Sequence, residues 1–178
     1  MIKKYIAISL CLGLTGCIGA GVNSPLHHIN NNKFPKLVGI DLKGNLRKLP
    51  NIFNAKYNIV IVAFKRDHQA TVDAWLPVLK QFQKTYPNLV YFEIPLINNM
   101  NSIKRLWLNN VMRWGIKNPQ ARLKTITVYT DRQAFISLMD MQINHIYVLL
   151  LDKNGTIKLK LKGAPQPINV EKLKQALI

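Results

Sequence analysis

Cysteine is scarce in this 178-residue chain, and its two cysteines, Cys11 and Cys17, both lie near the beginning. A small secreted domain held together by disulfide bonds is therefore excluded, because such a domain needs cysteine pairs throughout its length. Acidic residues are also few, with 8 against 25 lysines and arginines, so the formal charge is +17. This excess predicts anionic neighbours, although a general bias toward basic residues would produce the same count.

The apolar run at residues 5–14 is too short to span a bilayer as a mature helix, because a transmembrane helix needs about 20 residues. It follows Lys3 and Lys4, and its last residue begins LTGC, residues 14–17. This pattern is typical of a bacterial lipoprotein signal. We therefore expect residues 1–16 to be a signal peptide and Cys17 to carry diacylglycerol. The alternative is an ordinary secretory signal with a chance cysteine.

A lipid on the cysteine would anchor the protein to a membrane on its periplasmic side. Ile18, not aspartate, comes next in the chain, and by resemblance to the usual lipoprotein sorting pattern this favours the outer membrane. Residues 17–33 have the composition of a flexible tether. His27 and His28 in that tether lack a fixed geometry and further ligands, so we expect no metal site.

The expected compartment also limits the partners. Nucleic acid is not expected there, and no cofactor is expected either. An envelope protein, lipopolysaccharide or anionic phospholipid fits the basic charge better.

Residues 34–178 have the pattern of one mixed α/β domain. Apolar, β-branched runs predict buried strands at residues 57–64, 88–97, 123–130 and 145–152. Alternating lysines predict an edge strand at residues 157–163, after an Asn-Gly turn. Two short extended pieces precede the first buried strand. Helical spacing of apolar residues predicts helices at residues 70–86, 102–115, 132–141 and 169–178.

Single residues predict where these elements end or bend. Pro77 should kink the first helix, and Pro95 should end the second buried strand. Ser102 and Asp131 are placed to cap the next two helices, and Gly115 is placed to end the first of these two.

The order and spacing of these features resemble the thioredoxin-like superfamily, which has a mixed central sheet flanked by helices. The likeness rests on DLKGNLRKLPNIFNAKYNIVIVAF, on YVLLLDKNGTIKLKLKG, and on Pro77, thirteen residues after Phe64. The resemblance implies that the redox cysteines would fall at Gln69 and Val72, and the active-site proline near Ile146. Disulfide exchange and peroxide reduction both need a thiolate. We therefore expect no redox chemistry where the first buried strand meets the first helix.

Other segments are similar to the mitochondrial ATP-synthase assembly-factor family and its bacterial relatives, which are thioredoxin-like without a usable cysteine pair. These segments are AFKRDHQATVDAWLP, VMRWGI, TITVYTDRQAF and LLLDKNGTIKLKLKG. The resemblance implies a chaperone-like or assembly role. We therefore expect a membrane-anchored binding or assembly module in the periplasm, and not an enzyme.

The segment KRDHQ, residues 65–69, joins the first buried strand to the first helix. Ligands favour the carboxyl ends of strands in open α/β sheets, and helix N-termini attract anions. The candidates for binding an anion or an acidic partner are Lys65, Arg66, His68, Gln69 and Arg113, and Arg132 could join them. Alternatively, Asp67 or Thr71 only caps the helix and the other side chains are solvated.

A residual enzyme that uses His68 or His145 is the rival hypothesis for this junction. His145 qualifies because the fourth buried strand of such a fold lies beside the first. However, no serine or glutamate stands at a recognisable nucleophile elbow. We therefore expect no catalytic residue here.

The predicted helix at residues 102–115 carries an apolar stripe, consisting of Ile103, Leu106, Trp107, Val111 and Trp114. Residues at this spacing usually face a core. If the core is complete without this helix, Trp107 and Trp114 would instead form an interaction face for a partner or a membrane surface, flanked by Lys104, Arg105 and Arg113.

Overall fold

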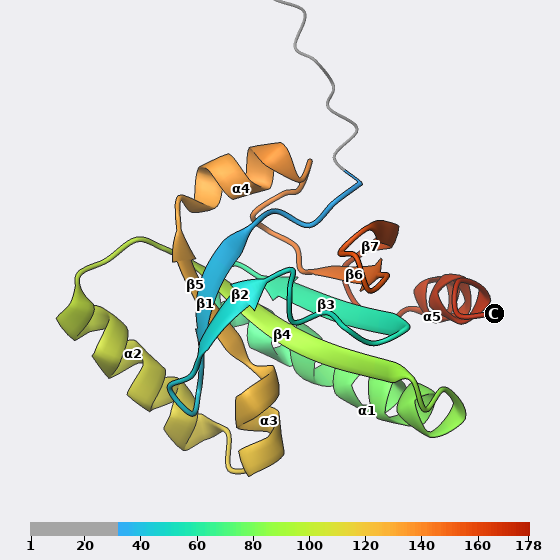
Figure 1. Cartoon of the computed structure of the whole chain (residues 1–178), viewed down its shortest axis with the longest axis horizontal. Helices are drawn as coiled ribbons and strands as arrows, with labels where there is room; N and C mark the ends of the chain where they lie inside the picture. The colour runs from blue at the N-terminus through green and yellow to red at the C-terminus, as the bar shows by residue number, and fades with distance from the viewer. Residues whose placement is uncertain (1–31) are drawn as a thin grey trace, which may run out of the picture.

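The computed structural model describes residues 32–178 (Figure 1). The predicted signal peptide, the lipidation site Cys17 and residues 17–31 of the predicted tether lie outside the described residues. The described residues form one seven-stranded mixed sheet with helices around it, as the α/β prediction requires. None of the helices within residues 32–178 is both long enough and apolar enough to cross a membrane.

The sheet has the strand order β2-β1-β5-β4-β3-β6-β7. The strands are β1 (Leu37–Asp41), β2 (Leu46–Leu49), β3 (Tyr57–Ala63), β4 (Leu89–Asn98), β5 (Ile126–Thr130), β6 (Tyr147–Leu151) and β7 (Ile157–Lys162). The helices are α1 (Gln69–Thr85), α2 (Ser102–Gly115), α3 (Pro119–Lys124), α4 (Arg132–Leu138) and α5 (Pro167–Gln175), and the short 3-10 helix η1 (Arg66–His68) precedes α1. Strands β3, β4 and β5 are parallel, so their carboxyl ends share one edge of the sheet.

Strand β3 explains why the sheet needs cover on both faces. Its five inner residues, 58–62, are all buried. On one face, Ile59 and Ile61 belong to a core completed by side chains of α1 and α5. On the other face, Val60 and Val62 belong to a core completed by α4 and by Phe34 and Phe53. Figure 1 shows α1 and α4 on opposite sides of the strands.

One helix was not predicted from the periodicity. Residues 123 and 124, predicted to begin a strand, instead end α3. The Asn118 side chain accepts hydrogen bonds from the Gln120 and Ala121 amides, at 2.8 and 3.4 Å. Pro119 occupies the first turn. This asparagine–proline pair is a helix-start signal, but a six-residue helix is too short to show an apolar period.

The prediction that Pro95 ends the second buried strand was wrong. Strand β4 continues to Asn98, and Pro95 lies opposite Ala63, at the last pair with β3. The ladder from β4 to β5 is interrupted here, between an isolated bridge at Glu93 and the regular pairing that begins at Leu96. A missing proline amide therefore costs no regular ladder bond at this position.

Helix caps and breaks match the predictions in part. Asp131 caps α4 as predicted, because its carboxylate accepts from the Ala134 amide at 3.0 Å. Helix α2 is capped by Asn101 instead of Ser102, with the asparagine side chain accepting from the Lys104 amide at 2.9 Å. Helix α1 continues through Pro77 as one element.

Trp75 fixes α1 against the sheet. Its side chain is completely buried, in the core shared by α1 and α5. The indole Nε1 donates a hydrogen bond to the carbonyl of Gly163, just after β7, at 2.9 Å. One side chain thus joins the first helix to the far edge of the sheet, through both apolar burial and a satisfied polar group.

We expect Trp75→Ala to lower the free energy of unfolding by about 3–5 kcal/mol, because it empties a large core site and leaves the Gly163 carbonyl without its donor. Urea denaturation followed by circular dichroism measures the change. Trp107→Ala is the matched control, because Trp107 is 66% exposed and surface changes usually stay within about 0.5 kcal/mol. Equal losses in the two variants would contradict the burial difference.

Candidate functional site

The segment KRDHQ lies at the edge where the carboxyl ends of β3, β4 and β5 meet. Phe64 directly follows β3. The guanidinium of Arg132 donates a hydrogen bond to the Phe64 carbonyl at 2.9 Å. The amide of Arg132 donates to the Asn98 side chain at the end of β4, at 3.2 Å. The start of α4 is thereby tied to the ends of two strands, and Arg132 joins this junction.

Most of the polar candidates at the junction are already engaged. The Lys65 ammonium donates to the Asn144 side chain, in the loop before β6. The side-chain amide of Gln69 donates to the carboxylate of Asp73, one turn further along α1, at 2.9 Å. The Arg66 side chain is exposed and makes no hydrogen bond or ion pair with residues 32–178. Arg66 is therefore the candidate cation that is most available to a ligand.

Arg113 does not converge on this edge, so its grouping with the junction was wrong. Its Nε donates to the carbonyl of Leu42, after β1, at 2.7 Å. Arg113 lies near the C-terminal end of α2, whereas only the N-terminal end of that helix follows a strand end at the junction. The sequence shows the helix but not the direction in which it leaves the sheet.

His68 is a neutral hydrogen-bond acceptor and not an added cation. Its side chain is buried, and its Nδ1 accepts from the Phe64 amide at 3.2 Å. Burial is the largest cause that lowers the pKa of His68, and the charge of Lys65 lowers it further. With Nδ1 accepting, the ring hydrogen stays on Nε2, so neither nitrogen is free to act as a base.

His145 lies near enough to affect the pKa of His68, in agreement with the expected proximity of the two strands. No hydrogen bond joins the two imidazoles among the described residues. Residues 32–178 also contain no group of three or more histidines, cysteines or acids placed to hold a metal ion. The two histidines therefore do not form a recognisable catalytic or metal-binding pair.

The helix start at the junction has no side-chain cap, so the predicted capping by Asp67 or Thr71 was wrong. Neither η1 nor α1 has a side chain that accepts from its first amides. Uncapped amides beside an exposed arginine can attract an anion weakly. The junction therefore combines one exposed cation with uncapped helix amides.

Glu93 is a half-buried carboxylate that the sequence reasoning missed. It lies in β4, on the side of the sheet near Asp73 of α1. Burial raises the pKa of Glu93 to about 7, and the negative charge of Asp73 adds to the effect. The available signal was a single acid within the apolar strand NLVYFEIPLI. Its carboxylate makes no hydrogen bond with the described residues, so ionisation is costly.

Lys124 lies over the ring of Tyr91, on the same strand as Glu93, with its Nζ 4.4 Å from the ring centroid. Burial lowers the pKa of this lysine, and the nearby charge of Lys80 lowers it further. The surroundings of β4 thus disfavour charge of either sign near the middle of the strand.

Helix α2 is the second candidate, and its apolar stripe faces solvent. The exposed fractions are Ile103 78%, Leu106 64%, Trp107 66%, Val111 38% and Trp114 76%. Within residues 32–178 both core clusters are complete without any side chain of α2. The expectation that such a stripe faces a core is therefore wrong here, and the exposure has the form that an interaction face requires.

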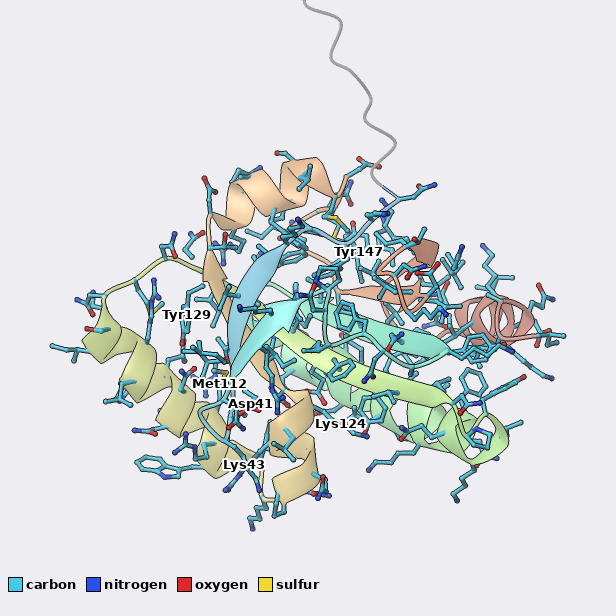
Figure 2. All side chains as sticks on the ribbon, in the orientation of Figure 1. Asp41, Lys43, Met112, Lys124, Tyr129 and Tyr147 are labelled. Atoms are coloured by element: carbon cyan, nitrogen blue, oxygen red, sulfur yellow. The ribbon has the colours of Figure 1, made fainter. Side chains whose placement is uncertain are left out.

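The inner side of α2 is held largely by polar contacts. The Asn109 side chain accepts from the Tyr129 hydroxyl of β5 at 2.9 Å, and the Arg105 guanidinium lies 4.9 Å from the Tyr129 ring centroid. Figure 2 shows Tyr129 and Met112 between α2 and the strands. Helix α2 thus differs from an ordinary surface helix, because its inner side combines hydrogen-bonding groups with Met112 while its most exposed side is apolar.

The turn that receives Arg113 is itself held by Asp41, also labelled in Figure 2. This buried carboxylate accepts hydrogen bonds from Asn45 and Lys43 and forms an ion pair with Arg47 at 2.7 Å. Burial acts to raise the pKa of Asp41, but these hydrogen bonds outweigh it and lower the pKa below its usual value. The C-terminal end of α2 is therefore attached, through Arg113, to a turn that hydrogen bonds hold in place.

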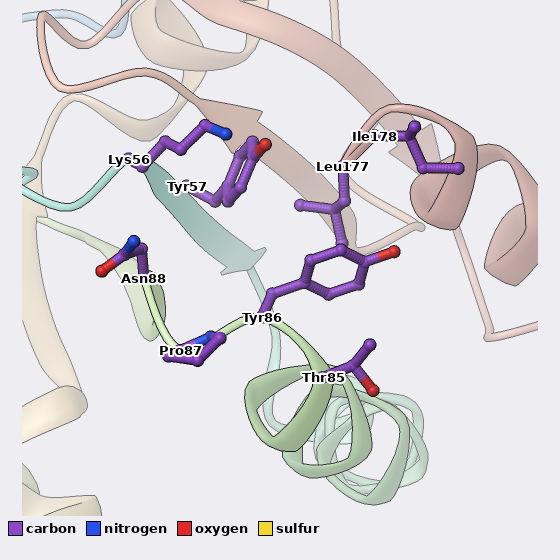
Figure 3. Close-up of a pocket in the computed structure, with 8 residues that line it drawn as sticks. All are labelled: Lys56, Tyr57, Thr85, Tyr86, Pro87, Asn88, Leu177 and Ile178. Carbon is purple, nitrogen blue, oxygen red and sulfur yellow. The ribbon is translucent and has the colours of Figure 1, made fainter.

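A shallow hollow of about 320 Å³ lies at the opposite end of β3 from the junction (Figure 3). Tyr57 and Tyr86 line it with their rings edge to face, 6.3 Å between centroids, together with Leu177 and the terminal Ile178. Neither the junction nor α2 contributes to its walls. The hollow and the candidate residues are therefore separate features.

Comparison with solved structures shows a thioredoxin-like fold, as predicted. Yeast Sco1 is 13% identical, with 81% of this chain and 93% of that chain covered and a TM-score of 0.54. BsSco, of the Sco family of cytochrome c oxidase assembly proteins, is 11% identical, with 82% and 93% covered and a TM-score of 0.51. The exposed lipoprotein thioredoxin Etrx1 of Streptococcus pneumoniae strain TIGR4 is 11% identical, with 80% and 98% covered and a TM-score of 0.53.

Comparison of sequences adds one match. The family described as ATP10 protein matches residues 24–177. No curated protein sequence matches the chain significantly.

We expect Glu93→Gln to stabilise the protein more at high pH than at low pH. The pKa of about 7 in the folded state lies above the usual 4.5, so the folded state binds this proton more tightly than the unfolded chain. Stability from the protonated form is complete below about pH 4.5 and declines as the pH rises toward about 7. The variant should gain up to about 3 kcal/mol at about pH 8 and almost nothing at about pH 4.

Urea denaturation at the two pH values measures this difference. Glu171→Gln, at an exposed acid of α5, is the matched control and should show little change at either pH. A gain for Glu93→Gln that is the same at both pH values would show that the carboxylate is not held protonated by burial.

Proposed function

This chain belongs to the ATP10 protein family, and from that membership we propose that it is a non-redox binding or assembly module, held at the periplasmic side of a membrane by a lipid on Cys17. The family match and the Sco neighbours support an assembly-type protein with a thioredoxin fold. The proposal adds three finer points: the lack of redox chemistry, the lack of any other catalysis, and the lipid anchor.

The lack of thiols supports the first point. Residues 18–178 contain no cysteine, and Gln69 and Val72 stand where the resemblance places the redox pair. Gln69 is occupied with Asp73, and Val72 is buried in the core. Thiol–disulfide exchange needs an attacking thiolate, and neither an amide nor an isopropyl group can supply one. The domain proper therefore has no residue for thiol chemistry, which supports a role in binding.

The state of His68 supports the second point. An enzyme that used His68 or His145 is the rival proposal. A general base needs a free ring nitrogen within reach of a substrate proton, but Nδ1 of His68 is occupied by a main-chain amide. The adjacent Asp67 is exposed and forms no hydrogen bond with His68. The geometry therefore favours a module that recognises a partner.

The signal-like sequence at the N-terminus supports the third point. LTGC at residues 14–17 provides the cysteine on which the proposed anchor depends. The exposed pneumococcal lipoprotein with the same fold shows that this architecture occurs on a lipid-anchored protein. The residue after the cysteine is Ile18, which favours the outer membrane. In that setting the excess of basic residues suits an acidic envelope protein or an anionic surface.

We expect Cys17→Ala to move the protein from the membrane fraction to the soluble periplasmic fraction, or to leave an uncleaved precursor. Fractionation of cells with metabolic labelling by palmitate measures both outcomes. Cys11→Ala is the matched control, because this cysteine lies within the proposed signal peptide and should not affect the anchor. Incorporation of palmitate into the Cys17→Ala variant would refute lipidation at that residue.

We expect Arg66→Glu to weaken capture of the envelope partner in a cross-linking experiment on intact cells, because it reverses the most available positive charge at the junction. Added salt should weaken capture by the unaltered protein as well, since exposed charges are screened over about 8–10 Å. Lys174→Glu, at an exposed cation of α5, is the charge-matched control and should capture normally. Turnover of a small molecule that His68→Ala abolishes would favour the enzyme instead.

A further inference from the structure

Helix α2 has an outer face, formed by Ile103, Leu106, Trp107 and Trp114, that is apolar and unusually exposed. Each of these side chains has between 64% and 78% of its surface exposed. Their spacing of three, four and seven residues places them on one side of the helix. Monomeric soluble proteins rarely leave so many large apolar side chains together in water, so this outer face of α2 is suited to contact with something else.

The same part of the chain has no acidic residue. Between Glu93 and Asp131 the sequence contains no aspartate or glutamate, across all of α2 and α3. Six basic residues occupy this stretch: Lys104, Arg105, Arg113, Lys117, Arg122 and Lys124. Lys104, on α2, and Lys117, just beyond its C-terminal end, are both exposed. The apolar outer face is therefore flanked by positive charge at both ends, with no negative charge in the stretch.

Folding does not account for this face. The hydrogen bonds of Asn109 with Tyr129 and of Arg113 with Leu42 attach α2 through its inner side. Both cores of the described residues are closed by α1, α4, α5 and the loops. Replacing the outer apolar residues with polar ones would thus remove no contact that holds the domain together.

We propose that α2 docks on an anionic phospholipid bilayer, lying in the plane of the membrane surface. Ile103, Leu106, Trp107 and Trp114 enter the boundary between headgroups and acyl chains, and Lys104 and Lys117 contact lipid phosphates. A helix with tryptophan and leucine on one face and basic residues beside them has the composition of an interfacial helix. Fourteen residues span about 21 Å, enough to lie on a bilayer but too few to cross it.

The charge distribution favours a bilayer over a second copy of this chain. A symmetric dimer through the outer face of α2 would bring two acid-free, basic surfaces together, and like charges would oppose it. A lipid surface needs no matching groove and accepts a convex helix directly. The inference does not depend on the proposed function, because the face lies on the domain itself and would bind lipid with or without acylation of Cys17.

The docking would also orient the domain. Helix α2 begins at Ser102, four residues after β4 ends at Asn98, so its first turn lies close to the edge of the sheet that carries the junction. Membrane contact through α2 would therefore hold the Arg66 region near the bilayer surface. A binding module placed in this way would meet partners that are themselves in the membrane.

Tryptophan fluorescence of the full chain on vesicles tests the proposal. Vesicles of phosphatidylcholine with phosphatidylglycerol are compared with vesicles of phosphatidylcholine alone, each with and without brominated acyl chains. Trp75 is completely buried, so quenching by bromine reports Trp107 and Trp114. Co-sedimentation is measured in parallel, because the N-terminal segment can bring every variant to the vesicles without α2 docking.

We expect blue-shifted, bromine-quenched emission on the anionic vesicles and much less on the neutral ones. Ile103→Gln combined with Leu106→Gln should remove most of the quenching while leaving the unfolding curve unchanged. Lys104→Gln combined with Lys117→Gln should remove the preference for anionic lipid. Ile168→Gln is the matched control, because Ile168 is an equally apolar, 62% exposed residue on α5, and quenching should persist.

Three results would overturn the proposal. The first is unquenched, water-like emission from chains that co-sediment with anionic vesicles, which would leave a protein partner as the occupant of the outer face. The second is quenching that the Ile103 and Leu106 changes do not reduce. The third is a blue shift that grows with protein concentration in the absence of lipid, which would indicate a second copy of the chain.

Discussion

The burial of β3 on both faces is the constraint on which the rest of the domain depends. A strand with five consecutive buried residues cannot lie at a surface, so each face of the sheet requires a layer of its own. Trp75 and the rest of α1, with α5, provide one layer. Phe34, Phe53 and α4 provide the other. These layers use the apolar residues of every long helix except α2.

The exposure of the apolar side of α2 follows from that completeness. With both layers filled, the helix has no apolar surface of the sheet to cover, and it is attached through Asn109, Arg105 and Arg113 instead. The attachment is firm at the C-terminal end of α2, because Asp41 fixes the turn whose Leu42 carbonyl accepts from Arg113. An element held by polar groups can present its apolar residues outward, which is an unusual freedom for a surface helix.

The junction after β3 illustrates a different outcome of the same fold. In this family member the position holds Gln69 and Val72, and its neighbours are occupied with structural tasks. His68 accepts from the backbone, Lys65 reaches Asn144, and Arg132 ties α4 to Phe64. Arg66 remains outward and charged. The junction is thus a corner fixed by hydrogen bonds, with Arg66 as its available cation.

The sequence by itself determined the strands, the long helices, the cap at Asp131 and the absence of cysteine from residues 18–178, because each depends on local spacing or composition. It also identified the apolar stripe of α2, but not its direction, because the same spacing suits a core and a docking face. Only the tertiary structure separated Arg113 from the junction, joined Arg132 to it and showed His68 as a buried acceptor. It also placed Glu93 under α1, where its charge is costly. These properties depend on which residues distant in the chain become neighbours, and that is decided by how the sheet and its two layers close.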